Sequence, residues 1–341
     1  MEKARDAILQ TGGGNMSDIK MDVLQLYPIG EVRQIDSISG GIINDSWRVR
    51  TESGHYILQR LSDRAFDERV IADQWQVLDW LHRRNFRWAP RLILTARREK
   101  FVRQDGRIWR LMAYIDHDPI ATRTDEKILA ATAVLAEFHR AMKDCPYDPI
   151  YKIKDFHDSP VIWENLGDLA FGQDRDDIVK SMTDEVIYLH EVMPSYFLPN
   201  DLPETLIHGD PRFDNFLFRG EEVAALIDFD TVMRANELID IGDFCRSMCR
   251  RETLFNQELF DKIITQYLSI NHRYYIAALA KQATALITLE LSARFFMDCF
   301  SPPGQEYFGW DAEKYLTARD HNLARGKMYL EYFWNIIKNS L

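Results

Sequence analysis

The sequence contains few cysteines and no pattern that would use them as metal ligands. Its 341 residues include four Cys, and none forms a C-x-x-C pair. A zinc site and a disulfide framework are both disfavoured, and the low count fits a reducing compartment. Cys245 and Cys249 lie four residues apart in a predicted helix, where core packing is the expected role.

Basic residues are also scarce relative to acidic ones. The chain has 42 Lys and Arg against 53 Asp and Glu, a formal net charge of -11. Nucleic-acid-binding proteins are more often basic, so this class of partner is not expected. The acidic balance by itself indicates no more than a well-solvated surface.

Targeting and membrane signals are absent as well. No long apolar run follows a basic N-terminal region, and no apolar stretch reaches the length of a membrane span. We therefore expect a cytoplasmic protein without a membrane partner, and leave its oligomeric state open. Residues 1–28, with three consecutive Gly, are predicted to be a leader that is partly mobile.

The region 29–115 is predicted to form a small antiparallel sheet with one helix, because short alternating segments are separated by turn residues. Asp105-Gly106 is the turn signal of the last hairpin. The expected elements are strands at 32–38, 45–51 and 55–61, a helix at 64–84, and a hairpin at 100–115.

The remainder, 116–341, has mostly helical periodicity. Helices are expected within 126–142, 174–195 and 254–292. Two short apolar runs, 205–210 and 223–230, interrupt the helical pattern, and each ends in aspartate. The whole chain is therefore predicted to be an α+β protein of two lobes, with a small antiparallel-sheet N-lobe and a larger, mostly helical C-lobe.

The segment LIHGDPRFDNFLF (206–218) places His, Asp, Arg and Asn between apolar residues. Buried charge is costly unless it is paired or bound to a metal, so we interpret the segment as a site for chemistry rather than an acidic surface turn. Asp210 is the candidate base that accepts a hydroxyl proton. Asn215, five residues later, is a candidate Mg²⁺ ligand, because Mg²⁺ prefers hard oxygen donors. His208 is expected to orient the loop by hydrogen bonds.

Asp228, at the end of the second apolar run, is the candidate second Mg²⁺ ligand. The turn at 218–223 would place two strands side by side and bring Asp228 to Asp210 and Asn215. Arg212 stands two residues after Asp210, where protein kinases have a lysine that contacts the transferred phosphoryl group; an arginine could do the same, since its guanidinium fits phosphate oxygens. For Asp230, three roles stay open: metal ligand, substrate contact, or partner of an arginine.

The spacing H-x-D-x-x-x-x-N is that of a kinase catalytic loop. Together with ALIDFDT and VLAEFHRAM, the segment resembles the aminoglycoside phosphotransferase and choline kinase superfamily. Scattered blocks such as HYILQRL, FHDSP and DHNLARGKMYLE are most similar to the N-acetylhexosamine 1-kinase group. These blocks are spread over almost the whole chain.

The resemblance implies a protein-kinase-like fold, ATP and Mg²⁺ as cofactors, and a small hydroxyl-bearing acceptor. The hexosamine kinase group makes a sugar the first choice of acceptor. ATP would lie between the lobes. The segment 111–115 would be the hinge, with the backbone from Met112 to Tyr114 at the adenine.

Two features of the N-lobe depart from protein kinases. SGGIIN (39–44) stands where a G-x-G-x-x-G loop is expected. Gly40 and Gly41 could let backbone amides approach phosphate, and Asn44 is a candidate polar contact, although a hairpin turn explains the glycines equally well. Gln59 occupies the third strand where the usual kinase residue is lysine. Phosphate binding would then depend more on Mg²⁺, Arg212 and backbone amides.

For the acceptor, the resemblance points to Arg294, in the apolar stretch 289–300, with a structural salt bridge as the alternative role. Tyr307 offers a flat face for a sugar, and a rim aromatic is the plainer explanation. A homoserine-, choline- or aminoglycoside-type kinase is the alternative enzyme. A nucleotide-binding pseudokinase or scaffold is the alternative outside enzymology, which Gln59 favours and the intact Asp210, Asn215 and Asp228 set opposes.

Overall fold

The computed structural model describes residues 16–38, 44–62, 67–119, 122–171, 177–301, 311 and 314–338. The chain divides into two compact units, each with its own internal contacts. The first comprises Met1–Asp79 and Pro90–Asp116, and the second comprises Trp80–Ala89 and His117–Leu341. Residues 1–15 of the predicted leader, and Gly40 and Gly41, lie outside the described part.

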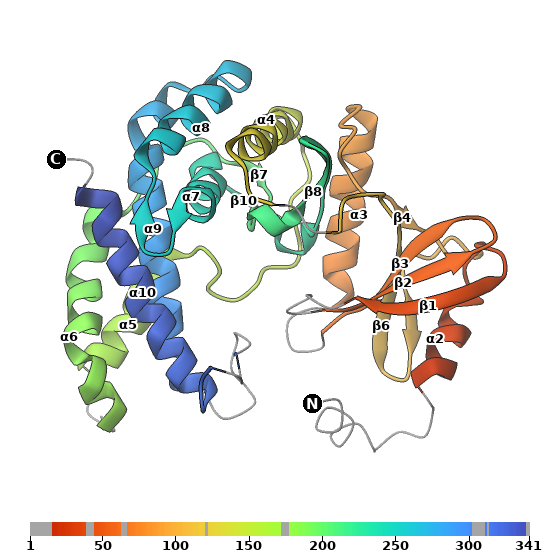
Figure 1. Ribbon diagram of the computed structural model, residues 1–341, viewed down its shortest axis with the longest axis horizontal. Helices are drawn as coiled ribbons and strands as arrows, with labels where there is room; N and C mark the ends of the chain where they lie inside the picture. Colours follow the sequence, from red (N-terminus) through yellow and green to blue (C-terminus); the bar gives the residue numbers. More distant parts are fainter. Residues whose placement is uncertain are drawn as a thin grey trace. The chain divides into compact units, whose positions relative to one another are not determined.

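The first unit is built on an antiparallel sheet (Figure 1). The strand order is β1-β2-β3-β6-β4, and β5 pairs with β6. Its elements are α2 (Met16–Leu24), β1 (Val32–Ile38), β2 (Asp45–Thr51), β3 (His55–Arg60), α3 (Glu68–Arg83), β4 (Leu92–Ile93), β5 (Val102–Gln104) and β6 (Arg107–Ala113).

The core of this unit follows from the alternation of side chains along each strand. Leu58, Trp109 and Leu111 share one face of the sheet and are almost entirely buried. Trp109 stacks on Trp47 with ring centroids 5.5 Å apart. The end of α2 packs onto the same core through Leu24. The opposite alternation sends the polar side chains of β3 and β6 to the other face.

The predicted strands agree with β1, β2 and β3 to within one residue. The predicted helix 64–84 corresponds to α3, which begins four residues later, at Glu68. The hairpin is confirmed, with its turn at Asp105 and Gly106, which have φ of 50° and 71°. The two-residue strand β4 was not predicted, because it is too short to show a periodicity.

The second unit is mostly helical, with short two-stranded sheets. Its helices, besides the end of α3, are α4 (Asp125–Met142), α5 (Ser159–Phe171), α6 (Asp177–Val192), α7 (Glu237–Met248), α8 (Gln257–Ile270), α9 (Tyr274–Asp298) and α10 (Ala318–Lys338). Its strands are β7 (Thr205–Ile207), β8 (Phe216–Arg219), β9 (Glu222–Leu226), β10 (Met233–Ala235), β11 (Arg250–Arg251) and β12 (Leu254–Phe255).

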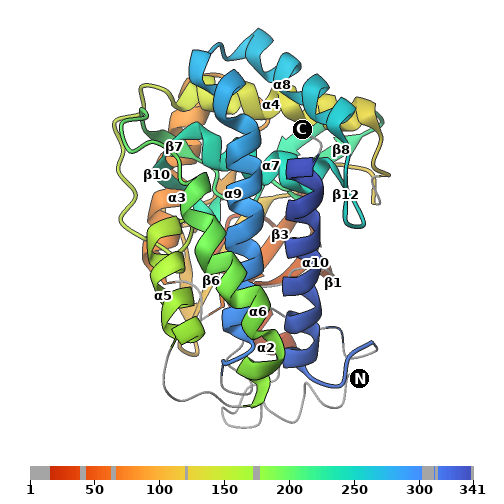
Figure 2. The same ribbon diagram turned by 90° about the vertical axis from the view of Figure 1, so that its left-hand side faces the viewer.

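Helix α9 is the central helix of this unit, and Figure 2 shows it beside α10 and behind α6. By length and composition alone α9 could cross a membrane, contrary to the expectation that no stretch is long enough. The structure gives it another role, because 67% of its most apolar stretch is buried. Gly242 of α7 allows close packing on α9, where a Cβ would lie 2.7 Å from the Ala283 carbonyl oxygen.

Two features of this unit were not specified by the sequence pattern. The helical stretch 254–292 contains two helices, because α8 ends at Ile270 and α9 begins at Tyr274. The apolar run at 205–210 does not pair with the run at 223–230. Instead β7 pairs with β10, while β9 pairs with β8 through the predicted turn at 218–223.

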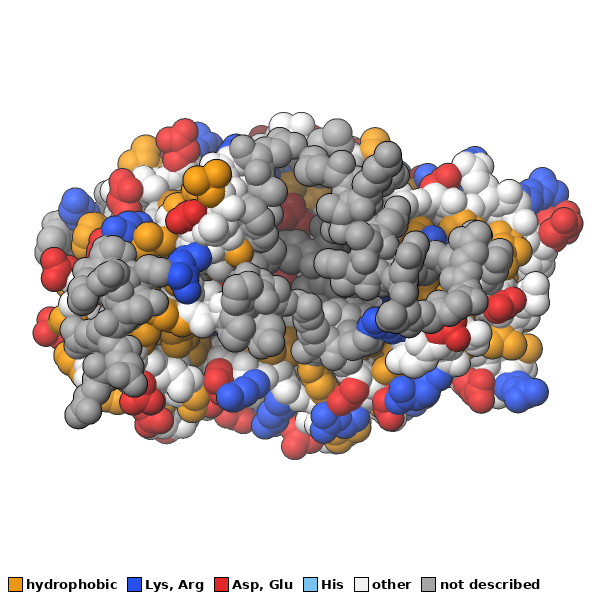
Figure 3. Space-filling view, turned by 90° about the horizontal axis from the view of Figure 1, so that it is seen from below, with side chains coloured by type: hydrophobic (Ala, Val, Ile, Leu, Met, Phe, Trp, Pro, Cys, Tyr) orange, Lys and Arg blue, Asp and Glu red, His pale blue; other side chains and the backbone are white. Residues whose placement is uncertain are grey.

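The cysteines and the surface agree with the composition. All four cysteines are free and buried, as core packing requires. On the face shown in Figure 3, acidic and basic side chains of the described residues are interspersed, and neither sign forms a continuous patch there. This mixture is typical of a solvated surface.

Candidate active site

The polar segment noted in the sequence forms a loop of residues 208–215, here called the catalytic loop. It follows β7 and ends in the short 3-10 helix η2 (Phe213–Asn215). Asn215 Nδ2 donates to the Asp210 carbonyl oxygen at 2.7 Å and lies 3.3 Å from Asp210 Oδ2. The Asn215 amide therefore closes the loop on itself and holds the two predicted side chains next to each other.

Asp228 is held against the catalytic loop by the residues on either side of it. His208, which is fully buried, donates from Nε2 to the Ile227 carbonyl oxygen at 2.9 Å. Thr231 Oγ1 donates to the His208 carbonyl oxygen at 2.8 Å. Asp228 itself takes a left-handed conformation, with φ of 67°, at the start of the 3-10 helix η3 (Phe229–Thr231).

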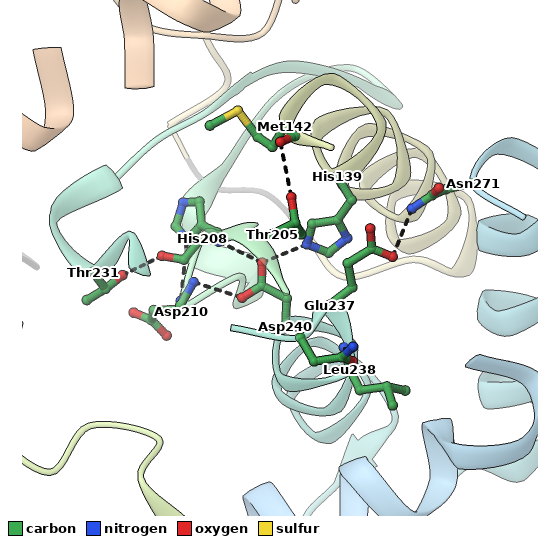
Figure 4. A network of polar contacts seen from close by, with 12 residues as sticks. His139, Met142, Thr205, His208, Asp210, Thr231, Glu237, Leu238, Asp240 and Asn271 are labelled. Atoms are coloured by element: carbon green, nitrogen blue, oxygen red, sulfur yellow. Dashed lines mark hydrogen bonds and ion pairs between the residues drawn. The ribbon is translucent and has the colours of Figure 1, made fainter. Parts of the chain in front are cut away.

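Helix α7 anchors the loop through Asp240, a residue that sequence reasoning missed (Figure 4). The fully buried Asp240 carboxylate accepts the backbone N–H of His208 at 2.7 Å and of Gly209 at 2.8 Å. It also accepts His139 Nε2–H at 2.9 Å. A signal existed in the sequence, because an acidic residue in the apolar stretch ELIDIGDF must be paired if that stretch is buried.

These donors decide the charge of Asp240. Burial alone would raise its pKa, but the hydrogen bond from His139 and the backbone N–H donors of the loop outweigh burial, so the pKa is lowered. His139 Nδ1 accepts the hydroxyl of Tyr267 at 2.7 Å, which fixes the ring and leaves Nε2 as the donor to Asp240. His139 is thus a structural residue that holds α4 to α7.

Asp210 lies at the centre of several charges. About 30% of its side chain is exposed, and protein atoms surround the rest. Burial raises the pKa of Asp210 to about 7, and the negative charge of Asp243 adds to this rise. The nearby Arg212 guanidinium opposes it, and Asp228 reinforces it. The negative charge of Asp228 therefore makes Asp210 harder to ionise, as is usual for two carboxylates that share one site.

A second missed residue, His157, holds the other side of the loop. His157 Nε2 donates to the Gly209 carbonyl oxygen at 2.9 Å, and Nδ1 lies 3.0 Å from Glu290 Oε2. Ser159 Oγ donates to the other Glu290 oxygen. Burial lowers the pKa of His157, but its bond to Glu290 outweighs burial and the net pKa is raised. Both ring nitrogens face acceptors, which agrees with a protonated ring.

Other predicted residues of the second unit have the following positions. Arg212 Nε lies 3.4 Å from Asp210 Oδ2. Asp230 is 3% exposed, within η3. Arg294 is half-buried on α9, and its guanidinium lies 5.2 Å from the centre of the Phe156 ring. Tyr307 lies outside the described residues. No contact of these side chains tests the substrate roles, which stay predictions.

In the first unit, Gln59 has a cationic neighbour that the sequence pattern does not indicate. Arg110, its cross-strand partner, is 1% exposed and donates from Nε to Gln59 Oε1 at 2.9 Å. Arg110 Nη1 also donates to Gln74 Oε1 at 3.1 Å. Gln59 Nε2 in turn donates to Ser46 Oγ at 3.2 Å. The charge that is missing from the third strand is thus present on the adjacent strand.

Three further predicted nucleotide contacts are described in this unit. Asn44 Oδ1 accepts the Ser62 backbone N–H at 3.0 Å. Met112 is buried in β6, between β3 and β4. The Tyr114 backbone N–H donates to the His55 carbonyl oxygen at 3.1 Å. A role of these three residues at a nucleotide stays a prediction.

The donor set suits Mg²⁺ rather than a metal held by many side chains. Within the described ranges, no group of three or more His, Cys, Asp or Glu side chains could hold a metal ion. The amide nitrogen of Asn215 is used by Asp210, which leaves its side-chain carbonyl oxygen as a hard donor. The backbone N–H of Ile227, one residue before Asp228, donates to the Asn215 backbone carbonyl oxygen at 2.9 Å. Mg²⁺ commonly takes one or two protein ligands and completes its shell with water and phosphate, so these residues fit it.

Comparison with known families and sequences relates this chain to phosphotransferases. Residues 34–275 match the model of the phosphotransferase enzyme family. A homoserine kinase from Methylorubrum populi is 26% identical over 206 residues, which cover 60% of this chain and 61% of that protein. A homoserine kinase from Rhizobium meliloti is 23% identical over 303 residues, 86% of this chain and 88% of that one. The chain thus spans about three fifths of the first relative.

Solved structures share the fold along nearly the whole chain. An aminoglycoside phosphotransferase from Alicyclobacillus acidocaldarius has a TM-score of 0.65 at 16% identity, covering 97% of this chain and 98% of its own. A microcompartment-associated aminopropanol kinase has a TM-score of 0.66 at 16% identity, covering 95% and 98%. The predicted kinase-like α+β fold is therefore confirmed.

Proposed function

Because the chain belongs to the phosphotransferase enzyme family, we propose that it transfers the γ-phosphoryl group of ATP to a hydroxyl group of a small molecule, with Mg²⁺ as the cofactor. One observation carries this proposal. The Asn215 side-chain nitrogen donates to Asp210, so its oxygen is available to a cation. Hydrogen bonds between His208 and the residues on both sides of Asp228 hold the Asp228 segment to the same loop. These contacts support a base and metal ligands that act at one site.

In this proposal each side chain has one task. Asp210 orients the acceptor hydroxyl and takes its proton as the new O–P bond forms and the bond from the γ-phosphorus to ADP breaks. Asn215 and Asp228 hold Mg²⁺, which neutralises phosphate charge when bound. Arg212 balances charge on the transferred group. Positioning and electrostatics supply most of the acceleration.

The nucleotide contacts belong to the first unit. We assign the phosphates to Gly40, Gly41 and Asn44, with Gln59 held in place by Arg110. The adenine is assigned to the backbone from Met112 to Tyr114. The partners of Gln59 support the assignment of the phosphates, because the buried Arg110 guanidinium beside Gln59 supplies the positive field that a lysine gives in protein kinases.

Two classes of acceptor are proposed. A sugar follows from the sequence blocks that resemble the N-acetylhexosamine 1-kinase group, with Arg294, Tyr307 and Asp230 as its contacts. A hydroxy amino acid follows from the curated relatives that are named homoserine kinase. An acceptor panel of hexosamines, other sugars, homoserine, choline and an aminoglycoside, followed by ADP release, separates them.

The base is tested by Asp210→Asn, which keeps the size of the side chain. We expect kcat to fall by about 10²–10⁴-fold while the KM for ATP changes little, because only the proton acceptor is lost. Removal of Mg²⁺ by EDTA should abolish turnover. Near-normal kcat in Asp210→Asn rejects the role of Asp210. Binding of Mg²⁺·ATP without turnover of any acceptor by the wild-type protein favours a pseudokinase. We place the activity in the cytoplasm.

A further inference from the structure

Asp243, on α7, has a buried carboxylate oxygen that is not used. The residue is 5% exposed. Its Oδ1 accepts Arg246 Nε at 2.9 Å and Arg246 Nη2 at 2.6 Å. Its Oδ2 is buried and has no hydrogen-bond partner in the described part of the chain. A buried acceptor of this kind is costly, so native proteins rarely retain one without a ligand or another function.

Asp243 lies on the face of α7 that meets the catalytic loop. Asp240 and Asp243 are three residues apart, so they share one face of α7. Asp240 on that face binds the backbone of His208 and Gly209. The charge of Asp243 acts on Asp210 more strongly than that of any other residue, and it also acts on His157. Asp243 therefore lies close to the base, on the face of α7 that meets the loop.

The charge around Asp243 indicates what it would bind. The side chain of Arg246 is 90% buried and donates two hydrogen bonds to Asp243 Oδ1. The Asp243–Arg246 pair therefore has no net charge. Other described charges at the catalytic loop are paired in sign as well: Asp210 with Arg212, His157 with Glu290, and Asp228 with the cation that it would bind. A neutral surrounding gives a cationic ligand little advantage, whereas Oδ2 still accepts a hydrogen bond from a hydroxyl group.

We propose that Asp243 Oδ2 binds a second hydroxyl group of the acceptor, different from the one that is phosphorylated. The acceptor class that follows is a polyhydroxylated compound, such as a sugar or a polyol, rather than an amino alcohol with a single hydroxyl. This inference rests on the proposed phosphotransferase function. It adds Asp243 as a residue that selects and positions the acceptor.

The test combines enzyme variants with acceptor analogues. Asp243→Asn keeps the shape and removes the charge. Asp243→Leu/Arg246→Met replaces both partners by apolar side chains, a change that buried ion pairs often tolerate without loss of stability. With the best polyol acceptor of the panel, we expect kcat/KM for the acceptor to fall at least about 10-fold in each, as for a lost hydrogen bond to a charged group, with the KM for ATP unchanged.

Monodeoxy analogues of that acceptor locate the hydroxyl. With the wild-type enzyme, one analogue should have a kcat/KM at least about 10-fold below that of the parent acceptor. With Asp243→Leu/Arg246→Met the same analogue and the parent should differ little, because the carboxylate that binds this hydroxyl is already absent. Glu237→Gln is the matched control. It makes the same chemical change on the same helix, at a buried carboxylate bound by Asn271 and Tyr267. It should lower Tm and leave the acceptor KM unchanged.

Three outcomes overturn the inference. The folded Asp243 variants keep the wild-type kcat/KM for the acceptor, or each deoxy analogue loses equally with the wild-type and variant enzymes, or an amino alcohol with one hydroxyl is the fastest acceptor. In all three the wild-type protein is an active kinase, so the proposed function stands. A wild-type protein that turns over no acceptor removes both proposals, and this result is distinct from the other three.

Discussion

At the scale of single residues, Gly209 shows how closely the catalytic loop is packed. Its φ is +86°, and a Cβ there would lie 2.4 Å from the Thr231 carbonyl oxygen. Both the left-handed backbone and the close approach require glycine. The loop therefore touches the segment after Asp228 without room for one methyl group.

The variant Gly209→Ala should therefore lose about 3 kcal/mol of unfolding free energy, from backbone strain and the clash together, and should also lower kcat. Gly220→Ala is the matched control. Gly220 has φ of +58° but no atom within 4 Å of a Cβ, so only about 1 kcal/mol of backbone strain is expected. Chemical denaturation of both variants measures the difference, and equal losses would contradict the packing argument.

His157 gives a prediction for pH. Its pKa is raised in the folded protein above the ordinary 6.5, so folding binds a proton there. The stabilisation is complete below pH 6.5 and is lost as pH rises through the folded pKa. His157→Gln should cost about 3 kcal/mol of unfolding free energy below pH 6.5, and less at higher pH.

Urea denaturation between pH 5.5 and 9 measures this difference. Glu290→Gln removes the partner that raises the pKa, and should weaken the same pH dependence. A cost of His157→Gln that does not vary with pH would show that the ring is neutral in the folded protein.

At the scale of elements, α7 organises the second unit around one buried carboxylate. Asp240 collects the backbone of the catalytic loop and the His139 ring of α4 (Figure 4). The helix N-cap Asn236 accepts the Leu238 backbone N–H at 2.9 Å, which fixes where this face of α7 begins. Loop, α4 and α7 thus depend on each other.

Asp240→Asn should therefore affect both stability and turnover. An amide nitrogen would face one of the three donors, so we expect a loss of about 3 kcal/mol in unfolding free energy and a lower kcat. Thermal unfolding and steady-state kinetics measure the two effects. Glu237→Gln, on the first turn of α7, should lower stability with a smaller effect on kcat. Equal kcat losses in the two variants would contradict a specific role of Asp240 in holding the catalytic loop.

At the scale of the whole molecule, Mg²⁺·ATP should stabilise the native protein by mass action. At a concentration of 100 times Kd the expected gain is about 2.7 kcal/mol, seen as a rise in Tm. Asp228→Ala should lose the Mg²⁺-dependent part of this rise and keep any part due to ATP alone. A full Mg²⁺-dependent shift in Asp228→Ala would show that another residue holds the ion.

Several properties were determined by the sequence alone. The predicted phosphotransferase class and the two-part α+β fold are confirmed by the family match and by shared folds. The positions of β1, β2 and β3 and the hairpin at Asp105-Gly106 were also predicted, because alternation and turn residues are local signals. The short spacing from His208 to Asn215 marked the catalytic loop for the same reason.

The tertiary structure decided which distant residues meet that loop. Asp240 and His157 contact it from α7 and from the segment before α5, and the charge of Asp243 on α7 acts on Asp210. No sequence spacing relates these residues to the loop. The run at 205–210 pairs with β10 because strand pairing depends on how the chain folds back, which apolar patterns do not encode. Burial and the nearness of other charges, which set the pKa of Asp210 and leave Asp243 Oδ2 unused, exist only once the chain is packed.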